Sequence, residues 1–347
     1  MKTIAVIGAG MAGITAARTL VQAGFKVSVF EKSHGPGGRM ATRSTPYGSF
    51  DHGVQYFTVR DPQFMKAITE VPGTQAICRA WSANAVRVLD PLGRVIEAPL
   101  PLREPHFVAA PGMNALLNHW AEPLSDRGCL HLQSQVQFLL QSGKKQWRLV
   151  CSDGSEHGAF DGLVLAIPHV QADYLLRQSG SPATGFSGLD QMSHAEVAPC
   201  WTLMLAYPLA NQPGLSHLGP QWNAARSTHH RIAWICRESS KPGRSSVERW
   251  TVQASAEWSQ QHLEDDAERV QAKLIKAFSE LTGIRAEPGF AQTHLWRYAK
   301  TLQAVGKKHL WDPELQIGVC GDWLLGHRVE DAFVSGLSLA LSLADKN

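Results

Sequence analysis

The first 39 residues constrain the fold of this chain more than any other part. An apolar segment at 3–7 leads into a G-x-G-x-x-G motif at 8–13, which is followed by a helical pattern at 11–23, a strand pattern at 25–31 and Glu31. The first glycine permits a tight turn, the second lets backbone approach a pyrophosphate, and the third lets helix and strand pack closely. Helix N-terminal amides then face the phosphates, and the acid accepts hydrogen bonds from a ribose. The segment therefore predicts an adenine-dinucleotide site that includes Gly8, Gly10, Gly13 and Glu31.

This motif alone leaves NAD and FAD both open. The chain continues through Lys32 to a second glycine pair, Gly37 and Gly38, followed directly by Arg39. Two glycines permit close approach of the backbone, and an arginine pairs with phosphate oxygens in a forked geometry. The plainer interpretation is a solvated loop with an isolated arginine. The order of acid, double glycine and arginine favours FAD, which lies extended across the strand ends.

A second anchor is predicted near the C-terminus. A strand pattern at 315–320 ends in Gly321 and Asp322, and a helical pattern follows at 331–344. Asp322 can accept hydrogen bonds from ribityl hydroxyls, and a helix N-terminus at 329–332 can direct its dipole at the pyrimidine edge of a flavin. By itself this is an ordinary strand-to-helix turn, but together with the N-terminal anchor it favours FAD. Neither anchor contains a cysteine or histidine attachment motif, so we expect the FAD to be non-covalent.

Composition excludes several other classes. The 347 residues are 44% hydrophobic and 18% charged, as in ordinary globular proteins, and the net charge of +3 is spread along the chain. This disfavours a nucleic-acid or membrane-surface partner. The six cysteines form no C-x-x-C pair, which disfavours structural zinc and disulfide frameworks, and the His229-His230 pair fits a solvated turn better than a metal site. With no signal-peptide pattern and no apolar run of about 18 residues, we expect a cytoplasmic protein without bound metal.

Periodicity divides the chain into two intermixed domains. The continuous apolar run at 162–168 is typical of a buried parallel strand, whereas alternating patterns at 200–207, 231–236 and 250–254 are typical of antiparallel strands. We expect an α/β fold with a Rossmann-type FAD-binding domain and an inserted substrate domain on a mixed or antiparallel sheet. The cofactor domain is predicted to comprise 1–60, 108–168 and 290–347, and the substrate domain 61–107 and 169–289.

Several motifs resemble a known family. GAGMAG, GPGGRMATR, FDHGVQYFT, WRYA and CGDWLLGHRVEDAFVSG look like renalase, within the wider group of FAD-dependent amine oxidases. SKPGR at 240–244 and AEWS at 256–259 resemble the bacterial branch. The resemblance covers nearly the whole chain and is weaker in 60–105 and 170–230. It implies a fold of the glutathione-reductase or p-hydroxybenzoate-hydroxylase type.

The resemblance also implies an activity. Renalases oxidise the 2- and 6-dihydro isomers of NAD(P)H to NAD(P)+ and pass the electrons to O2, which yields H2O2. A hydride leaves the dihydropyridine ring without prior proton abstraction, so the flavin does the chemistry and no catalytic side chain is expected. The partners are then a small dinucleotide substrate and O2. The implied substrate contacts are Phe57, Thr58, Val59, Arg60 and Asp61 beside the nicotinamide, with His106, Cys200, Trp296 as an aromatic wall and Arg328. The implied cofactor contacts are Ala12, Glu31, Lys32, Gly38, Arg39, Gln55, Tyr56, Val136, Gly321, Asp322 and Val329.

Simpler roles compete for the substrate residues. Trp296 and Cys200 also fit core positions, Arg60 fits a surface ion pair with Asp61, and Arg328 fits a clamp on the last helix. Two other functions stay open, namely a flavin-containing amine oxidase and a flavin-binding protein without turnover. The sequence carries no signal for the oligomeric state.

Overall fold

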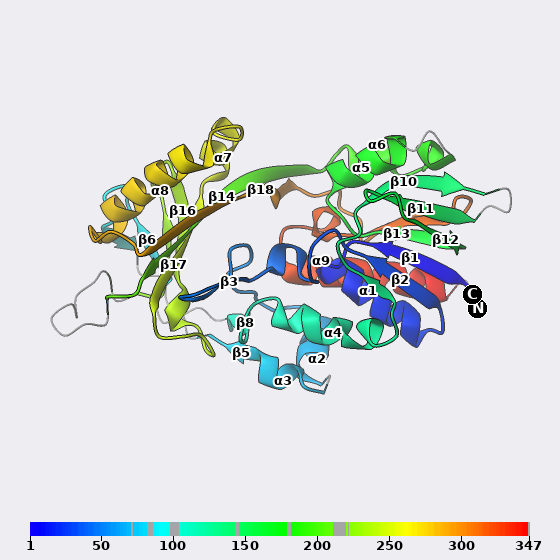
Figure 1. Cartoon of the computed structure of the whole chain (residues 1–347), viewed down its shortest axis with the longest axis horizontal. Helices are drawn as coiled ribbons and strands as arrows, with labels where there is room; N and C mark the ends of the chain where they lie inside the picture. Colours follow the sequence, from blue (N-terminus) through cyan, green and yellow to red (C-terminus); the bar gives the residue numbers. More distant parts are fainter. Residues whose placement is uncertain are drawn as a thin grey trace.

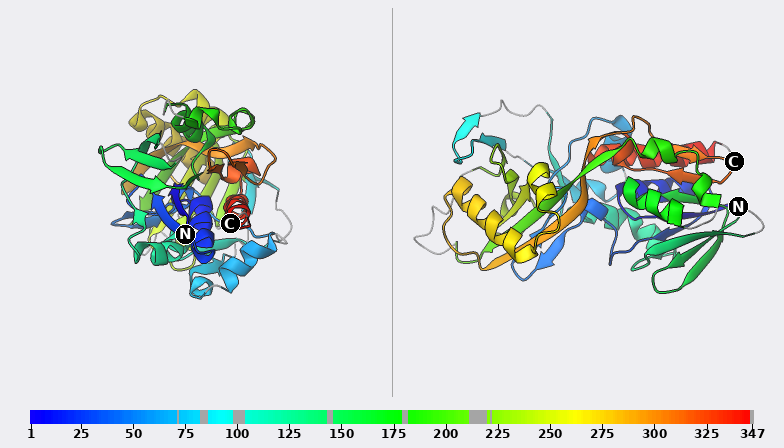
Figure 2. Two further views of the ribbon diagram at one scale, coloured as in Figure 1. Left: turned by 90° about the vertical axis from the view of Figure 1, so that its right-hand side faces the viewer. Right: turned by 90° about the horizontal axis from the view of Figure 1, so that it is seen from above.

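The computed structural model describes residues 1–70, 72–81, 86–97, 104–142, 146–178, 182–210, 220 and 222–345. In this part of the chain, two large sheets lie towards opposite ends of an elongated molecule (Figure 1). The long strands β14 and β18 run side by side from the second sheet towards the first. Figure 2 shows that both termini lie at the end that carries the first sheet.

The first sheet is the predicted Rossmann-type core. Its order is β19-β20-β13-β1-β2-β9, and every neighbouring pair is parallel except β19 with β20. Its apolar strands are buried on both faces, as expected for parallel strands. The three expected parts of the chain all contribute to it. The bounds are β1 Thr3–Ile7, β2 Lys26–Phe30, β9 Leu130–His131, β13 Gly162–Leu165, β19 Leu310–Asp312 and β20 Ile317–Val319.

Successive residues of β1 pack into two different cores. Ile4 and Val6 face the helices α1, α4 and α9, whereas Ala5 and Ile7 face a small three-stranded sheet with α5 and α6. Both faces of the sheet are thereby covered. The bounds are α1 Met11–Gln22, α4 Ala115–Ser125, α5 His169–Gln178, α6 Leu189–Met192, α9 Val329–Ala344, β10 Val136–Gln141, β11 Trp147–Cys151 and β12 Glu156–Phe160.

The second sheet has the order β18-β14-β17-β16-β15-β6-β7 and is antiparallel except where β15 pairs with β6. Leu203 and Leu205 face α8, which covers the outer face, whereas Met204 faces inward and packs on Phe50. The inner face therefore turns towards the loops of the first sheet. The bounds are β6 Val86–Leu89, β7 Val95–Glu97, β14 Glu196–Tyr207, β15 Ala224–Ser227, β16 Ile232–Arg237, β17 Glu248–Ala254, β18 Phe290–Gln303, α7 Ala256–Gln261 and α8 Ala267–Thr282.

Short elements connect the two sheets. Two antiparallel strand pairs, β3 with β4 and β5 with β8, and two helices come from residues 43–109, and four 3₁₀ turns occur in the described residues. The bounds are β3 Arg43–Thr45, β4 Gly48–Phe50, β5 Cys78–Ala80, β8 Phe107–Ala109, α2 Pro62–Thr69, α3 Thr74–Ile77, and turns at Gly38–Met40, Pro182–Gly185, Glu238–Ser240 and Asp322–Leu324.

The structure differs from the sequence-based expectation in two respects. The sequence does not predict α2 and α5, although Asp61 caps α2 by accepting from the N–H groups of Gln63 and Phe64. The expected domain segments are also divided differently by the packing. Strand β18, expected with the cofactor domain, pairs with β14 in the second sheet, while α5 and α6 pack on the first sheet.

Three further observations concern membrane helices, metal sites and cysteines. No helix in the described part of the chain is long and apolar enough to cross a membrane. The same residues include no group of three or more histidine, cysteine and carboxylate side chains placed to hold a metal ion. The six cysteines are free thiols.

Helices α1 and α9 meet at a contact that only glycine allows. A Cβ on Gly336 would overlap the backbone carbonyl of Ala12. Although alanine favours a helix over glycine by about 1 kcal/mol, we expect Gly336→Ala to lower the free energy of unfolding by about 1–3 kcal/mol. Urea denaturation monitored by circular dichroism measures this. Gly185→Ala is the control, because its added Cβ meets no atom within 4 Å. Equal effects of the two substitutions would contradict the predicted clash.

Candidate functional site

The two glycine motifs of the N-terminal segment lie against each other. Gly8 has a φ of +103° at the end of β1, and Gly10 caps α1 without a side-chain hydrogen bond. A Cβ on Gly38 would lie 3.2 Å from Cα of Gly10, and the N–H of Gly37 donates to the carbonyl of Ala9 at 2.9 Å. The structure thus joins the predicted residues 8–13 and 37–38 into one side-chain-free surface at the N-terminus of α1. Such a surface suits close approach by a phosphate.

Glu31 holds the backbone of this surface in place through hydrogen bonds. One carboxylate oxygen accepts from the N–H of Ala9 and the other from the N–H of Ser33, both at 2.8 Å. A carboxylate offers about four acceptor positions, so these bonds leave room for ribose hydroxyls. The segment before β10 lies alongside, since the N–H of Ser134 donates to the carbonyl of Glu31. Val136, which begins β10, is therefore near Glu31 in the fold, while Lys32 is exposed.

Arg39 and Asp322 bring together the two predicted anchors from opposite ends of the chain. The guanidinium donates to both carboxylate oxygens of Asp322, at 2.9 Å for Nη1, and also to the carbonyl of Ala299 at 3.1 Å. Gly321 is fixed by its N–H, which donates to the Ser335 hydroxyl at 2.9 Å. The pair places one cation beside one anion where the two predicted anchors meet. Val329 begins α9 a few residues later.

The loop after β4 is held by side chains from three sides. The carbonyls of Asp51, His52 and Gly53 accept in turn from Gln55 Nε2, Trp296 Nε1 at 3.0 Å and Gln253 Nε2 at 2.7 Å. The N–H of the next residue, Val54, donates to the carbonyl of Arg39 at 2.8 Å. Loops restrained this completely are typical of sites that must be preorganised. The loop also links the Arg39 turn directly to the second sheet.

A buried ion cluster anchors the same loop. Asp51 accepts from Lys241 Nζ at 3.0 Å and Arg244 Nη2 at 2.7 Å, and Lys241 also lies 3.0 Å from Glu238. All four side chains are fully buried. Burial alone would raise the pKa of Asp51, but Lys241 and Arg244 outweigh it and lower this pKa to about 2. Sequence reasoning missed the cluster, although Lys241 and Arg244 lie within the SKPGR motif.

One group of rings lies on the β18 side of the loop. We call His52, His294 and Trp296 the His52 cluster. The His52 ring stacks on Trp296 with centroids 5.1 Å apart and meets His294 edge-on at 4.9 Å. Burial, with help from His294 and Arg43, lowers the pKa of His52 to about 3, and burial lowers that of His294 to about 4, so both imidazoles are neutral at pH 7.

Cys200 belongs to the same face of the second sheet. It pairs with Trp296 across β14 and β18, so the structure brings these two predicted residues together. Burial raises the pKa of the Cys200 thiol to about 11, and the sulfur lies 3.6 Å from the carbonyl of Ala254. A thiol that stays neutral in this way is a poor nucleophile.

A second group of rings lies on the other side of the loop. We call Tyr56, Trp81, His106 and Trp234 the Tyr56 cluster. The Tyr56 ring centroid lies 4.2 Å from that of His106, 5.6 Å from that of Trp234 and 6.2 Å from that of Trp81. His106 was predicted as a substrate contact and Tyr56 as a cofactor contact, whereas the sequence did not single out Trp81 and Trp234. Isolated tryptophans in short strands carry no local signal of this convergence.

The remaining predicted substrate residues have structural contacts. Phe57 is buried at 2% exposure between the rings of Phe64 and Phe107. Arg60 Nε pairs with Glu104 at 2.6 Å, and its N–H donates to Glu330 at 2.7 Å. Thr58 and Val59 connect these two positions and are half-buried.

The last two residues of this set lie at helix N-termini. Asp61 caps α2, and Arg328 caps α9, where its N–H donates to Asp331 at 2.8 Å and its side chain pairs with Glu330 at 3.2 Å. Glu330 thus joins the 60–61 segment to α9, since it accepts from the N–H groups of both Arg60 and Asp61. The structure brings residues 57–61 and Arg328 together.

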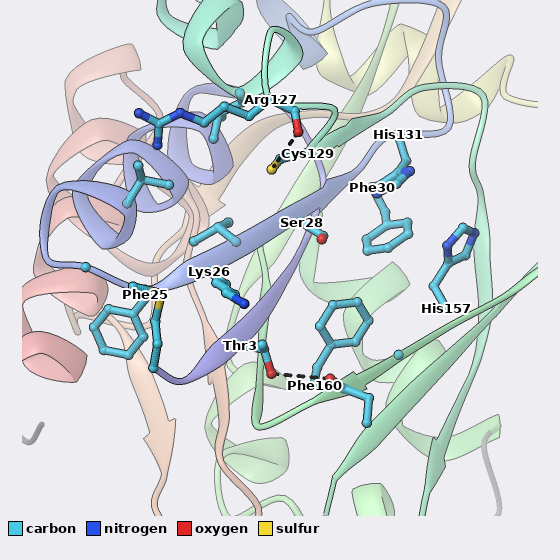
Figure 3. Close-up of a pocket in the computed structure, with 17 residues that line it drawn as sticks. Thr3, Phe25, Lys26, Ser28, Phe30, Arg127, Cys129, His131, His157 and Phe160 are labelled. Atoms are coloured by element: carbon cyan, nitrogen blue, oxygen red, sulfur yellow. Dashed lines mark hydrogen bonds between the residues drawn. The ribbon is translucent and has the colours of Figure 1, made fainter.

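A cleft of about 690 Å³ lies elsewhere in the molecule (Figure 3). It follows the edge of β2 beside β12, and Figure 3 shows Lys26, Phe30, His131, His157 and Phe160 around it. None of the predicted site residues lines it. The cleft lies beside the C-terminal ends of α1 and α4. A cation near such an end, here Arg127, complements the helix dipole. The cofactor candidates lie instead at the carboxyl ends of the parallel strands, where open α/β sheets bind ligands.

Comparison with known proteins agrees with this architecture. Residues 6–71 match the family model described as an NAD(P)-binding Rossmann-like domain. Similar solved structures include a candidate protoporphyrinogen oxidase from Exiguobacterium sp. 255-15, at 12% identity and a TM-score of 0.76 over 100% of this chain and 99% of that one. A triple mutant of putrescine oxidase has 12% identity and a TM-score of 0.68, with 100% of this chain and 99% of that chain covered. An oxidoreductase from Methanosarcina mazei has 14% identity and a TM-score of 0.66, with 97% of this chain and 99% of that chain covered. These similarities establish the fold. The predicted α/β class with a Rossmann-type domain is confirmed.

The ion cluster makes a prediction about stability. We expect Asp51→Asn to lower the free energy of unfolding by about 3–5 kcal/mol at pH 7, because it leaves Lys241 and Arg244 buried without their shared anion. The pKa of Asp51 is lowered to about 2, so the carboxylate stabilises the fold above pH about 4 and this contribution is lost as the pH falls towards 2. Denaturant titrations from pH 7 to 3 test both statements. Asp173→Asn, which removes a carboxylate from an exposed pair with Arg177, should change stability by less than about 1 kcal/mol.

Proposed function

We propose that this chain is an FAD-dependent oxidoreductase that holds its cofactor without a covalent bond. The observation that carries the proposal is the junction of Gly10 with Gly38 and of Arg39 with Asp322, which unites both sequence anchors in one cradle. A side chain at Gly38 would fill the contact with Gly10, and α1 begins there without a side-chain cap. These residues fit a dinucleotide. Two of the similar structures are of proteins named as oxidases, which agrees with a redox role.

In this proposal each part of the cradle has a distinct task. The α1 N-terminus and Arg39 bind the pyrophosphate, Glu31 binds the adenosine ribose, and Asp322 accepts from the ribityl hydroxyls. The N-terminus of α9 directs its dipole at the pyrimidine edge of the ring. When bound, the flavin supplies a two-electron acceptor that takes a hydride and later passes the electrons to O2. The restrained loop at 51–55 fixes the position of the substrate relative to the flavin ring.

We further propose that the substrate is an aberrant dihydronicotinamide, the 2- or 6-dihydro isomer of NAD(P)H. The reaction converts the dihydronicotinamide, O2 and one proton into NAD(P)+ and H2O2. Oxidation needs only that a hydride leaves the ring, so it requires no general base. The neutral imidazoles and Trp296 of the His52 cluster provide a polar and aromatic wall against which a planar ring can be oriented.

Charge favours this substrate over an amine. Amines are largely protonated at neutral pH, and a site that binds them benefits from a free carboxylate. Among the described residues around the two ring clusters, the carboxylates are already paired: Asp51 with Lys241 and Arg244, Glu104 with Arg60, and Glu330 with Arg328. A cationic amine would therefore have to displace an arginine or a lysine from each of these carboxylates.

Anaerobic bleaching of the flavin tests the substrate class. We expect the yellow absorbance near 450 nm, the usual range of oxidised flavins, to disappear rapidly with 6-dihydro-NAD(P), because only hydride transfer is needed. Putrescine, benzylamine and ordinary NADH should reduce it far more slowly. Bleaching by amines alone would identify an amine oxidase, and a flavin that stays oxidised with every donor would identify a non-catalytic flavin-binding protein.

Asp322→Ala tests the cradle itself. We expect the variant to purify with much less flavin, because it loses the acceptors for the ribityl hydroxyls and leaves Arg39 without its anion. Acid precipitation of the wild type should release all flavin into the supernatant if binding is non-covalent. Asp190→Ala is the control, since this residue is exposed on α6. Thermal unfolding of flavin-free preparations separates lost affinity from lost folding, and a correctly folded Asp322→Ala protein with full flavin content would contradict the assigned role.

A further inference from the structure

Arg226 occupies a position on the inner face of the second sheet beside the Tyr56 cluster. It pairs directly with Trp234 across β15 and β16, so the two side chains leave the sheet on the same face. Ala224, two residues earlier on β15, packs into the core that also contains Trp81 and parts of the first sheet. Because residues two apart on a strand share a face, Arg226 also faces the first sheet.

The charge of Arg226 is uncompensated in the described part of the chain. The side chain is exposed and takes part in none of the ion pairs there. Its charge nevertheless reaches the ring cluster, since it adds to burial in lowering the pKa of His106. The nearest acid to that imidazole, Glu104, is already paired with Arg60 at 2.6 Å. A free cation therefore lies at the edge of an aromatic group.

The Tyr56 cluster also offers an unused donor and two accessible rings. Trp234 Nε1 is buried and has no hydrogen-bond partner among the described residues, whereas Trp81 Nε1 donates to the Ser240 hydroxyl at 3.3 Å. Tyr56 and Trp234 are only half-buried, so part of each ring is open to a ligand, while Trp81 and His106 are buried behind them. A ring that stacked on the open part of Tyr56 or Trp234 would thus lie beside the Arg226 guanidinium.

We propose that Arg226, Trp234 and Tyr56 form a subsite for a heteroaromatic ring that carries a phosphate, namely the adenylate half of the dinucleotide substrate. This inference rests on the proposed function and extends it, because it assigns a place to the part of the substrate that does not react. Every nucleobase can stack on an aromatic side chain, whichever base it is. A guanidinium group binds phosphate through forked hydrogen bonds. The subsite is separate from the cradle of the FAD adenine, which lies near Glu31 on the first sheet.

The test compares a complete with a truncated substrate in the flavin-loaded protein. Stopped-flow reduction is measured with 6-dihydro-NAD and with 6-dihydronicotinamide mononucleotide, which lacks the adenylate. We expect Arg226→Ala and Trp234→Ala each to raise the apparent dissociation constant of the dinucleotide about tenfold, in line with the loss of one charged hydrogen bond or one stacked base. The limiting rate of flavin reduction and the constants for the mononucleotide should stay unchanged.

Conservative and distant variants complete the design. Trp234→Phe should keep most of the affinity by stacking, and Arg226→Lys should recover part of it by charge. Arg269→Ala, on the exposed surface of α8, should have no effect. Calorimetric titration of the oxidised protein with AMP gives a readout without turnover, in which binding to the wild type should be lost in Arg226→Ala.

The outcomes distinguish this inference from the function on which it rests. Equal losses for dinucleotide and mononucleotide, or unchanged constants in both alanine variants, would overturn the subsite. If no dihydronicotinamide reduces the wild-type flavin, the proposed function fails. AMP binding that depends on Arg226 would still support the subsite in that case, and its absence would overturn both.

Discussion

The pairing of Asp51 with Lys241 and Arg244 is the interaction on which the rest of the site depends. Asp51 also accepts from the Thr42 hydroxyl at 2.8 Å and the N–H of Met113 at 2.9 Å, so one carboxylate ties the first sheet to the second. Compared with a well-packed apolar replacement of the whole cluster, such buried ion pairs contribute little net stability, since desolvation offsets much of the attraction. The main effect of the cluster is to fix the position of the loop that follows Asp51. The loop that follows Asp51 has one position relative to β17 and β18, and both ring clusters take their places from it.

This arrangement explains why the cofactor cradle and the second sheet can act together. Arg39 contacts Ala299 and Asp322 through its side chain, and its carbonyl accepts from Val54 in the restrained loop. Arg39 therefore connects the cradle to the restrained loop through its backbone carbonyl and to β18 through its side chain. A displacement of the second sheet would break hydrogen bonds at each of these points, so the inner face of this sheet is held at a fixed distance from Arg39 and Asp322.

The sequence predicted the parts of the fold that depend on local signals. Strand β1, helix α1 and the glycine turn between them follow from glycine spacing and apolar periodicity, which act over a few residues. Helix α2 is not predicted from the sequence, although Asp61 caps it by accepting from the N–H groups of Gln63 and Phe64. The buried ion cluster around Asp51 and the Tyr56 cluster are not predicted from the sequence either. Their members come from segments up to 193 residues apart, and no local pattern encodes such convergence.

In the proposed function, the two ring clusters provide a physical reason to prefer a dinucleotide substrate over an amine. His52 and Tyr56 belong to one loop, and four residues of extended chain span at most about 14 Å. Two aromatic surfaces are thus held within one dinucleotide length of each other, with an arginine beside the second. A small aliphatic amine has no ring for either surface and would meet arginine charge without a free carboxylate. A dihydronicotinamide dinucleotide has two rings and a pyrophosphate, so it can use both surfaces and the cation at once.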